Sequence, residues 1–507
     1  MTDVRNAPGA AWRLAFFALT AFTLTAPLTA QQPAPIELTL DRMVELALKD
    51  SYRVRQLLLD IDRTRALLQA ERAGLKSRVD LTLAAPELEA ISDYKWNSTL
   101  QRNELIHENT RRWEADLSIR QPVILFGYPT GGALSLNNKI YRYSQLDGDE
   151  RDAQFYNRYF VAYEQPLFQP NRMKNDLEQA QLELESSELE FQGDIVEMVN
   201  DLAEQYFELF ESAYQRVLAT QRLQNLEAAV AAAGQIVAAD STRAIELEQI
   251  QVALANARED QQSASSSLRL QIARLKQNLR LTTGDSIALT PVLDLQPITI
   301  DEARAIEFAV SLAPRMRELA INRRENEIRL AQTRGNDSFR VNLELTYGRE
   351  VQDPRFENLW TRPRNSYTIN VDAQVPLWDW GERKHRIRAD QYSLQRTDLS
   401  IQQTREEIAT NVRNELLNLK EFQQRALNMQ SNLSRAQQIT ATTLARYGNG
   451  EVTLVDVLQT IERESDTAEN RLEAYLGYQE ALIDLQQMTY YDFERGVPLI
   501  ERFRVGR

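Results

Sequence analysis

Residues 339–347 read FRVNLELTY, and apolar and polar side chains alternate along this segment. Residues 367–375, YTINVDAQV, show the same alternation. A period of two predicts a β-strand with one apolar and one polar face. About nine to eleven tilted residues of this kind are also enough for a strand to cross a lipid bilayer. Either segment alone is more typical of a half-buried strand in a soluble sheet, so the rest of the sequence has to be considered.

Matching segments occur earlier in the chain and predict a tandem repeat. Residues 78–83 (RVDLTL) align with 340–345 (RVNLEL), and 165–168 (QPLF) align with 375–378 (VPLW). The repeated unit is a helix, strands, a long helix and a further helix. Four strands at matching positions of the two units favour a membrane β-barrel.

The repeat sets the predicted domain boundaries. We expect a signal peptide at 1–30, a first repeat at 31–296, a second repeat at 297–490 and a C-terminal tail at 491–507. The first repeat should contain strands at 78–86 and 158–166, a β-rich insert at 87–157 and long helices at 171–283. The second should contain strands at 339–347 and 367–375 and long helices at 379–488.

The helices are expected to be unusually long, because residues 171–290 and 377–497 contain no proline. Apolar residues recur every seven positions, as in a coiled coil, at Leu177, Leu184, Phe191 and Met198. A helix from 171 to 239 would be ~100 Å long, which no compact globule can house. The helices therefore form either a long bundle or antiparallel pairs that build the wall of a tube.

The N-terminus has the features of a secretory signal. Arg5 and Arg13 precede or open an apolar run at 14–26, and small residues end the segment at Ala30. The run is shorter than the roughly 20 residues that a membrane-spanning helix needs. We expect cleavage near Ala30 rather than a buried N-terminal helix, and export of a mature chain without a helical anchor.

Composition excludes several kinds of site. The 507 residues include no cysteine and two histidines, His107 and His385, and the net charge is −14. Disulfides, thiolate metal sites, a lipid anchor on cysteine and a nucleic-acid partner are therefore not expected. The sequence also lacks a phosphate-binding loop and a nucleophile elbow, so we predict neither a cofactor nor an enzyme.

The breaks in the long helices carry the most specific signal. Residues 446–459 read RYGNGEVTLVDVLQ, in which Gly448 and Gly450 permit a tight helix–helix turn. The corresponding break in the first repeat has no glycine, and Asp240 and Ser241 are its turn formers.

Together these segments resemble the TolC-type outer-membrane efflux and secretion channel family over residues 38–488. The resemblance rests on the paired openings LTLD and ITID at 38–41 and 298–301, the strand-to-helix junctions PLF and PLWDWG that begin at 166 and 376, and residues 450–458.

The resemblance implies an α+β membrane protein that assembles as a homotrimer. Each subunit would give about four strands to one twelve-stranded transmembrane β-barrel, continued by a long antiparallel α-helical coiled-coil barrel in the periplasm. It also implies location in the outer membrane, contact with outer-membrane lipid, a periplasmic adaptor protein, and an inner-membrane RND or ABC transporter. The alternative is a soluble periplasmic coiled-coil scaffold.

The resemblance also implies positions for a periplasmic aperture. Asp456 matches an aspartate ring of the family, and a second ring falls on Gln459. Tyr447 would join Glu246 in the closed state. The family's gate arginine falls on Val452, and either Arg446 or Arg243 is a possible replacement. The tips that contact the adaptor would be Gly450 and Gly448, with Asp240 and Ser241 in the first repeat.

The insert at 87–157 departs from the family. It contains a further alternating segment at 113–120, followed by an expected turn at 129–132. It forms either an extra hairpin outside the barrel or two more barrel strands per subunit, and we favour the first, with four barrel strands.

Overall fold

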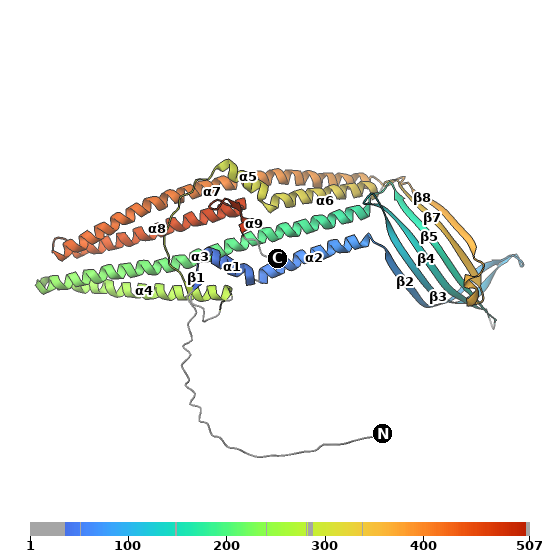
Figure 1. The fold of residues 1–507 in the computed structure, drawn as a ribbon, viewed down its shortest axis with the longest axis horizontal. Helices are drawn as coiled ribbons and strands as arrows, with labels where there is room; N and C mark the ends of the chain where they lie inside the picture. The colour runs from blue at the N-terminus through green and yellow to red at the C-terminus, as the bar shows by residue number, and fades with distance from the viewer. Residues whose placement is uncertain are drawn as a thin grey trace, which may run out of the picture.

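The computed structural model describes residues 36–50, 52–147, 150–239, 241–279, 281, 287–336 and 338–502. The predicted signal peptide and Asp240 lie outside the described residues. The molecule is long and narrow, with a twisted sheet at one end and paired helices along the rest (Figure 1).

Two very long helices run along the molecule. Helix α3 (Arg172–Ala239) has 68 residues and α7 (Glu382–Gly448) has 67, so each is about 100 Å long. Each turns back into an antiparallel partner, α4 (Ala244–Asn278) for α3 and α8 (Leu454–Thr489) for α7 (Figure 1). The shorter helices are α1 (Leu40–Asp50), α2 (Tyr52–Gly74), α5 (Glu302–Leu312), α6 (Pro314–Asn336) and α9 (Leu499–Arg502). The prediction of long rods is confirmed.

The sheet is antiparallel throughout and has the order β2-β3-β4-β5-β7-β8. Its strands are β2 (Arg78–Asn97), β3 (Arg102–Leu125), β4 (Tyr128–Asp147), β5 (Glu150–Leu167), β7 (Arg340–Asp353) and β8 (Arg364–Gln374). A 3-10 helix, η2 (Phe356–Trp360), connects the last two. Two short pairs lie elsewhere: β1 (Ile36–Glu37) beside β6 (Ile287–Ala288), and β9 (Tyr491–Asp492) beside β10 (Val497–Pro498).

The sheet has six strands, two more than the four expected for the barrel, because the insert at 87–157 joins the sheet and does not form a separate hairpin. The first and second strands of the first repeat extend well beyond the predicted 78–86 and 158–166, and β3 and β4 stand between them. The β3–β4 turn is Phe126-Gly127, both with positive φ (52° and 83°), and not 129–132. Two left-handed residues match the twist of a tight hairpin, so the chain reverses without leaving the sheet.

The helical part is held together by side chains from both halves of the chain. Ala305, Val412 and Leu482 belong to one buried cluster that joins α5, α7 and α8. Another joins α3 to α8, where the rings of Phe210 and Tyr475 stack 5.7 Å apart. Because these contacts link residues far apart in sequence, the two helix pairs form one continuous body.

Among the described helices, none combines the length and the apolar character needed to cross a lipid bilayer.

Candidate functional site at the helical tips

The α7–α8 turn is built by a glycine and a capping threonine. Gly450 has φ 78°, and its N–H donates to the carbonyl of Tyr447 (2.8 Å). Left-handed backbone of this kind suits a residue without Cβ. Helix α8 then begins with a capping box, in which Thr453 Oγ1 accepts from the Asp456 N–H and the Asp456 carboxylate accepts from the Thr453 N–H (3.0 Å).

The α3–α4 turn is different. A 3-10 turn, η1 (Ser241–Arg243), leads directly into α4, whose N-cap Arg243 makes no side-chain cap. Ser241 is exposed at this tip, and Asp240 lies outside the described residues. The two turns lie at the same end of the molecule, remote from the sheet (Figure 1).

A hydrogen-bonded triad joins the two tips. The Tyr447 hydroxyl donates to Glu246 Oε2 at 3.0 Å, across 201 residues of sequence. Arg243 donates from Nε and Nη2 to the two oxygens of the same carboxylate, at 2.8 and 2.7 Å. Its guanidinium also lies 5.7 Å from the centre of the Tyr447 ring. The expected contact between Tyr447 and Glu246 is therefore present, and Arg243 completes it.

Apolar packing surrounds the triad. Tyr447 is completely buried, and its ring belongs to a cluster with Leu226 and Ala233 of α3, Ile250 of α4, and Leu454 of α8. A tyrosine hydroxyl buried this deeply needs a partner, and Glu246 supplies it. The triad therefore connects the α3–α4 tip to the α7–α8 tip through hydrogen bonds.

The surroundings of the triad favour a charged Glu246 and a neutral Tyr447. The pKa of Glu246 is lowered, first by the hydrogen bonds from Arg243 and also by the one from Tyr447. Burial, together with the hydrogen bond to Glu246, raises the pKa of Tyr447 to about 12. A neutral phenol therefore donates to a charged carboxylate over a broad range around neutral pH.

The other residues predicted for the aperture lie near this triad. Asp456 and Gln459 are exposed and lie three residues apart on α8. Hydrogen bonds from the Thr453 hydroxyl and N–H lower the pKa of Asp456. Val452 packs against the apolar cluster, and Arg446 pairs with Glu451 (3.0 Å). Of the two arginines considered as replacements, it is Arg243 that contacts Glu246.

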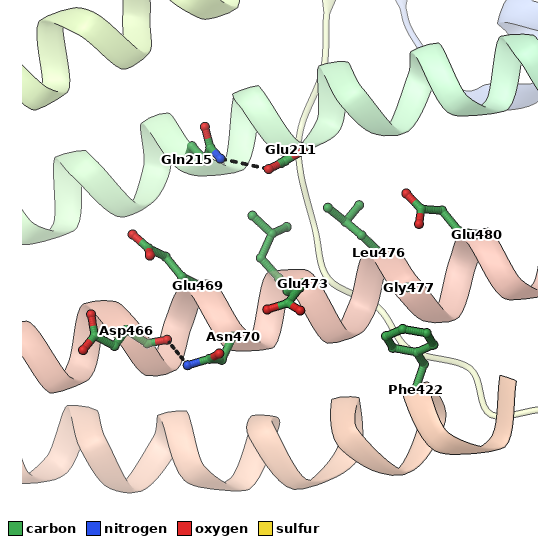
Figure 2. Close-up of a pocket in the computed structure, with 11 residues that line it drawn as sticks. Glu211, Gln215, Phe422, Asp466, Glu469, Asn470, Glu473, Leu476, Gly477 and Glu480 are labelled. Atoms are coloured by element: carbon green, nitrogen blue, oxygen red, sulfur yellow. Dashed lines mark hydrogen bonds between the residues drawn. The ribbon is translucent and has the colours of Figure 1, made fainter. Parts of the chain in front are cut away.

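An acidic hollow of about 730 Å³ lies further along the helices, between α3 and α8. Glu211 and Gln215 approach it from α3, and Phe422 of α7 lies beside Gly477 (Figure 2). Four carboxylates of α8 line it, namely Asp466, Glu469, Glu473 and Glu480. Burial, and then repulsion from Asp484, Glu204 and Glu211, raises the pKa of Glu480. The four lining carboxylates of α8 are three, four and seven residues apart, a spacing from which one acidic face of a helix can be predicted. The sequence gives no sign that α3 packs opposite that face.

In the parts of the chain that the structure describes, His, Asp and Glu side chains do not gather in groups of three or more suited to a metal ion. His385 is exposed near the start of α7, and the side chain of His107 lies outside what is described.

Comparison with known families identifies the C-terminal part of the chain, which contains strands β7 and β8 as well as helices α6, α7 and α8. Residues 306–489, from α5 to the end of α8, match the family described as Outer membrane efflux protein. The chain carries an outer membrane efflux protein domain. The resemblance drawn from the sequence is thereby confirmed. Among curated proteins, none matches the chain in sequence.

Solved structures extend the similarity beyond this efflux protein domain. The CusC channel matches with a TM-score of 0.63 over 90% of this chain and 92% of its own, at 14% identity. The outer-membrane channel OprN matches with a TM-score of 0.63 over 89% of both chains, also at 14% identity. The open-state MtrE outer membrane channel of Neisseria gonorrhoeae gives 0.59 over 89% and 88%, at 15% identity. The chain therefore has the α+β fold of outer-membrane efflux channels.

Proposed function

We propose that the chain is the outer-membrane channel subunit of a tripartite efflux pump or of a type I secretion system. It works as a homotrimer that passively conducts substrates from the periplasm to the exterior. One combination of features carries the proposal. An efflux protein domain occurs in the same chain as a sheet with an exposed apolar face and two long antiparallel helix pairs. The similarity of the fold to solved channel structures also supports the proposal.

The sheet is the membrane part in this proposal. Its apolar face carries Leu81 of β2, which is 62% exposed, and Ile369 of β8, which is 71% exposed. Such a face is costly in water and favourable in lipid. Closing the sheet into a barrel pairs every backbone group, which is the condition for strands in a bilayer. The helices then extend into the periplasm, where they reach an adaptor and an inner-membrane RND or ABC transporter.

The helical tips are the gate and the adaptor contact. Three copies of Asp456 around the trimer axis form a ring of carboxylates, with Gln459 beside it on the same helix face. The triad of Tyr447, Glu246 and Arg243 holds the closed state. The adaptor docks on the turns that contain Gly448 and Gly450, and on those that contain Asp240 and Ser241. The two tips correspond to the two tandem repeats of the chain, 31–296 and 297–490.

A soluble periplasmic coiled-coil scaffold is the competing function. It would use the same helices but gains nothing from an exposed apolar sheet face. Two measurements on the full chain separate the proposals. A channel remains in the outer-membrane fraction until detergent extracts it, and it migrates differently in denaturing gels before and after heating. Release by salt or osmotic shock alone, with no effect of heating, would support the scaffold.

A further inference from the structure

The strand order of the sheet gives the barrel a size that differs from the one expected. We infer that all six strands of each subunit lie in the barrel wall, so that a trimer closes an eighteen-stranded barrel by pairing β8 of one subunit with β2 of the next. The inference rests on the proposed function and specifies the width of its pore. Three lines of structure support it.

The first is the apolar face, which continues through the inserted hairpin. The pairing registers join Leu81 of β2 to Leu117 of β3, and Ile119 of β3 to Leu136 of β4. They join Leu136 in turn to Val161 of β5, and Val161 to Tyr347 of β7. Directly paired residues in a sheet lie on the same face. A single exposed apolar band therefore crosses the whole sheet, and β3 and β4 lie inside it.

The opposite face is polar in the same strands. On β3 and β4, Glu114 pairs with Arg112 (2.6 Å) and with Lys139 (2.5 Å), and the Ser118 hydroxyl donates to Asn137 (2.6 Å). Charged side chains facing a water-filled lumen and apolar side chains facing lipid are the pattern of a membrane barrel. A hairpin that lay outside the barrel in water would not need this division.

The second line is a row of exposed aromatic side chains where the strands meet the helices. Exposed aromatics lie just beyond the strands there: Phe168 follows β5, Phe339 precedes β7, and Trp378 and Trp380 lie between β8 and α7. The β3–β4 turn lies at this same end and adds Phe126 and Tyr128, of which Phe126 is 98% exposed. Aromatic residues at the level of the lipid headgroups mark the ends of membrane strands. The inserted hairpin thus carries its own part of the girdle.

The third line is the pair of open edges. Within the described residues, β8 pairs only with β7 and β2 only with β3. An exposed edge strand is a template for another strand, and barrels remove such edges by closure. Strand β2 leaves the helical end and β8 returns to it, so β8 of one subunit and β2 of a second copy of this chain are antiparallel (Figure 1). An even number of strands per subunit preserves this alternation around the ring.

The consequence is a wider pore. Barrel diameter grows roughly linearly with strand number, so eighteen strands give a barrel about 1.5 times as wide as twelve, and barrels of this size leave an aqueous channel. The periplasmic gate then limits what passes, and the β-barrel admits bulkier solutes than a twelve-stranded barrel would.

Single cysteines test the wall directly, because the chain has none of its own. Leu136→Cys and Asn137→Cys lie on opposite faces of β4, and Ile369→Cys on β8 is the reference. Each full-length variant is spin-labelled and reconstituted in vesicles of phosphatidylethanolamine and phosphatidylglycerol. Collision with oxygen reports lipid, and collision with a water-soluble nickel chelate reports water.

We expect labels at Leu136 and Ile369 to meet oxygen, and the label at Asn137 to meet the nickel chelate. A lipid-exposed label at Ile369 with a water-exposed one at Leu136 would overturn the inference alone and leave the channel in place. Water exposure at Ile369 as well would overturn the proposed function together with the inference.

A second measurement tests the width. Neutral polyethylene glycols of graded size are added on the barrel side of single channels, and the largest polymer that lowers the conductance is recorded. Removal of residues 102–147 deletes β3 and β4 and should reduce that limiting polymer radius by about 1.5-fold. An unchanged limit in a trimeric deletion variant contradicts the inference. If the deletion variant does not assemble, the spin-label result stands on its own.

Discussion

Three side chains hold the helical tips together, and their removal should open the channel. The double variant Tyr447→Phe with Glu246→Ala deletes the hydrogen bond between the α3–α4 and α7–α8 tips. It also leaves Arg243 without the carboxylate that it contacts through two nitrogens. We expect a higher resting single-channel conductance in planar bilayers. Arg446→Ala is the matched control, because Arg446 pairs with Glu451 on its own turn. Equal conductance of the unmodified protein, the double variant and the control would refute the assignment of the triad as the gate.

The same triad predicts a pH dependence at the residue scale. The hydrogen bond needs a charged Glu246, whose pKa is lowered, and a neutral Tyr447, whose pKa is about 12. The stabilisation by Glu246 is therefore complete above the ordinary glutamate pKa and is lost as the pH falls through its lowered value. Resting conductance should stay constant from about pH 6 to about pH 10 and rise in acid. Glu246→Gln should remove the acid step, and an acid step of full size in that variant would assign it to another group.

Sequence reasoning reached part of this site. The resemblance led to Tyr447 and Glu246, and their contact is present. It left Arg243 and Arg446 as equal alternatives, because the choice depends on how two turns 200 residues apart face each other. The acidic face of α8 was visible as spacing, but the hollow at Glu480 exists only because α3 packs opposite it.

At the scale of elements, α7 approaches α8 closely at one glycine. A Cβ at Gly477 would lie 2.4 Å from the Phe422 ring, so Gly477→Ala must displace a ring held between two helices. Overpacking of this kind costs about 1–3 kcal/mol. The matched control is Gly234→Ala in α3, where a Cβ meets nothing within 4 Å. There, helix propensity should stabilise by up to about 1 kcal/mol.

Denaturant unfolding followed by helical circular dichroism measures both effects. The midpoint should fall for Gly477→Ala and stay level or rise for Gly234→Ala. Equal midpoints for the two variants would mean that Phe422 moves aside without cost and that the α7–α8 contact tolerates a methyl group.

The elements themselves were predictable where their periodicity is regular. Alternation at 339–347 and 367–375 located β7 and β8, and the long proline-free stretches located α3 and α7. The insert was expected to form a hairpin, but its turn was misplaced, because the actual turn, Phe126-Gly127, lacks the asparagine or aspartate that usually marks such a turn. Pro129 and Gly131, which suggested a turn, lie inside β4.

At the scale of the whole molecule, part of the acidity behind the net charge of −14 is concentrated at defined places on the helices. Carboxylates line the hollow between α3 and α8, and Asp456 is exposed beside the α7–α8 tip. Three-fold symmetry in the proposed trimer multiplies each of these charges around one axis. A pore bordered by carboxylates attracts cations and repels anions, so the resting channel should prefer cations.

Two substitutions on one exposed face of α8 test this preference in opposite directions. Asp456→Asn removes three charges from the proposed ring, and Gln459→Asp adds three charges one helical turn away. The cation-to-anion permeability ratio, from reversal potentials in a salt gradient, should fall for the first variant and rise for the second. Loss of the Asp456 carboxylate also weakens the capping box of α8, because that carboxylate accepts from the Thr453 N–H. Thr453→Ala weakens the same cap without changing charge, so it should leave the permeability ratio unaltered. A ratio that shifts equally in Thr453→Ala and Asp456→Asn would mean that the turn's shape, and not its charge, selects the ions.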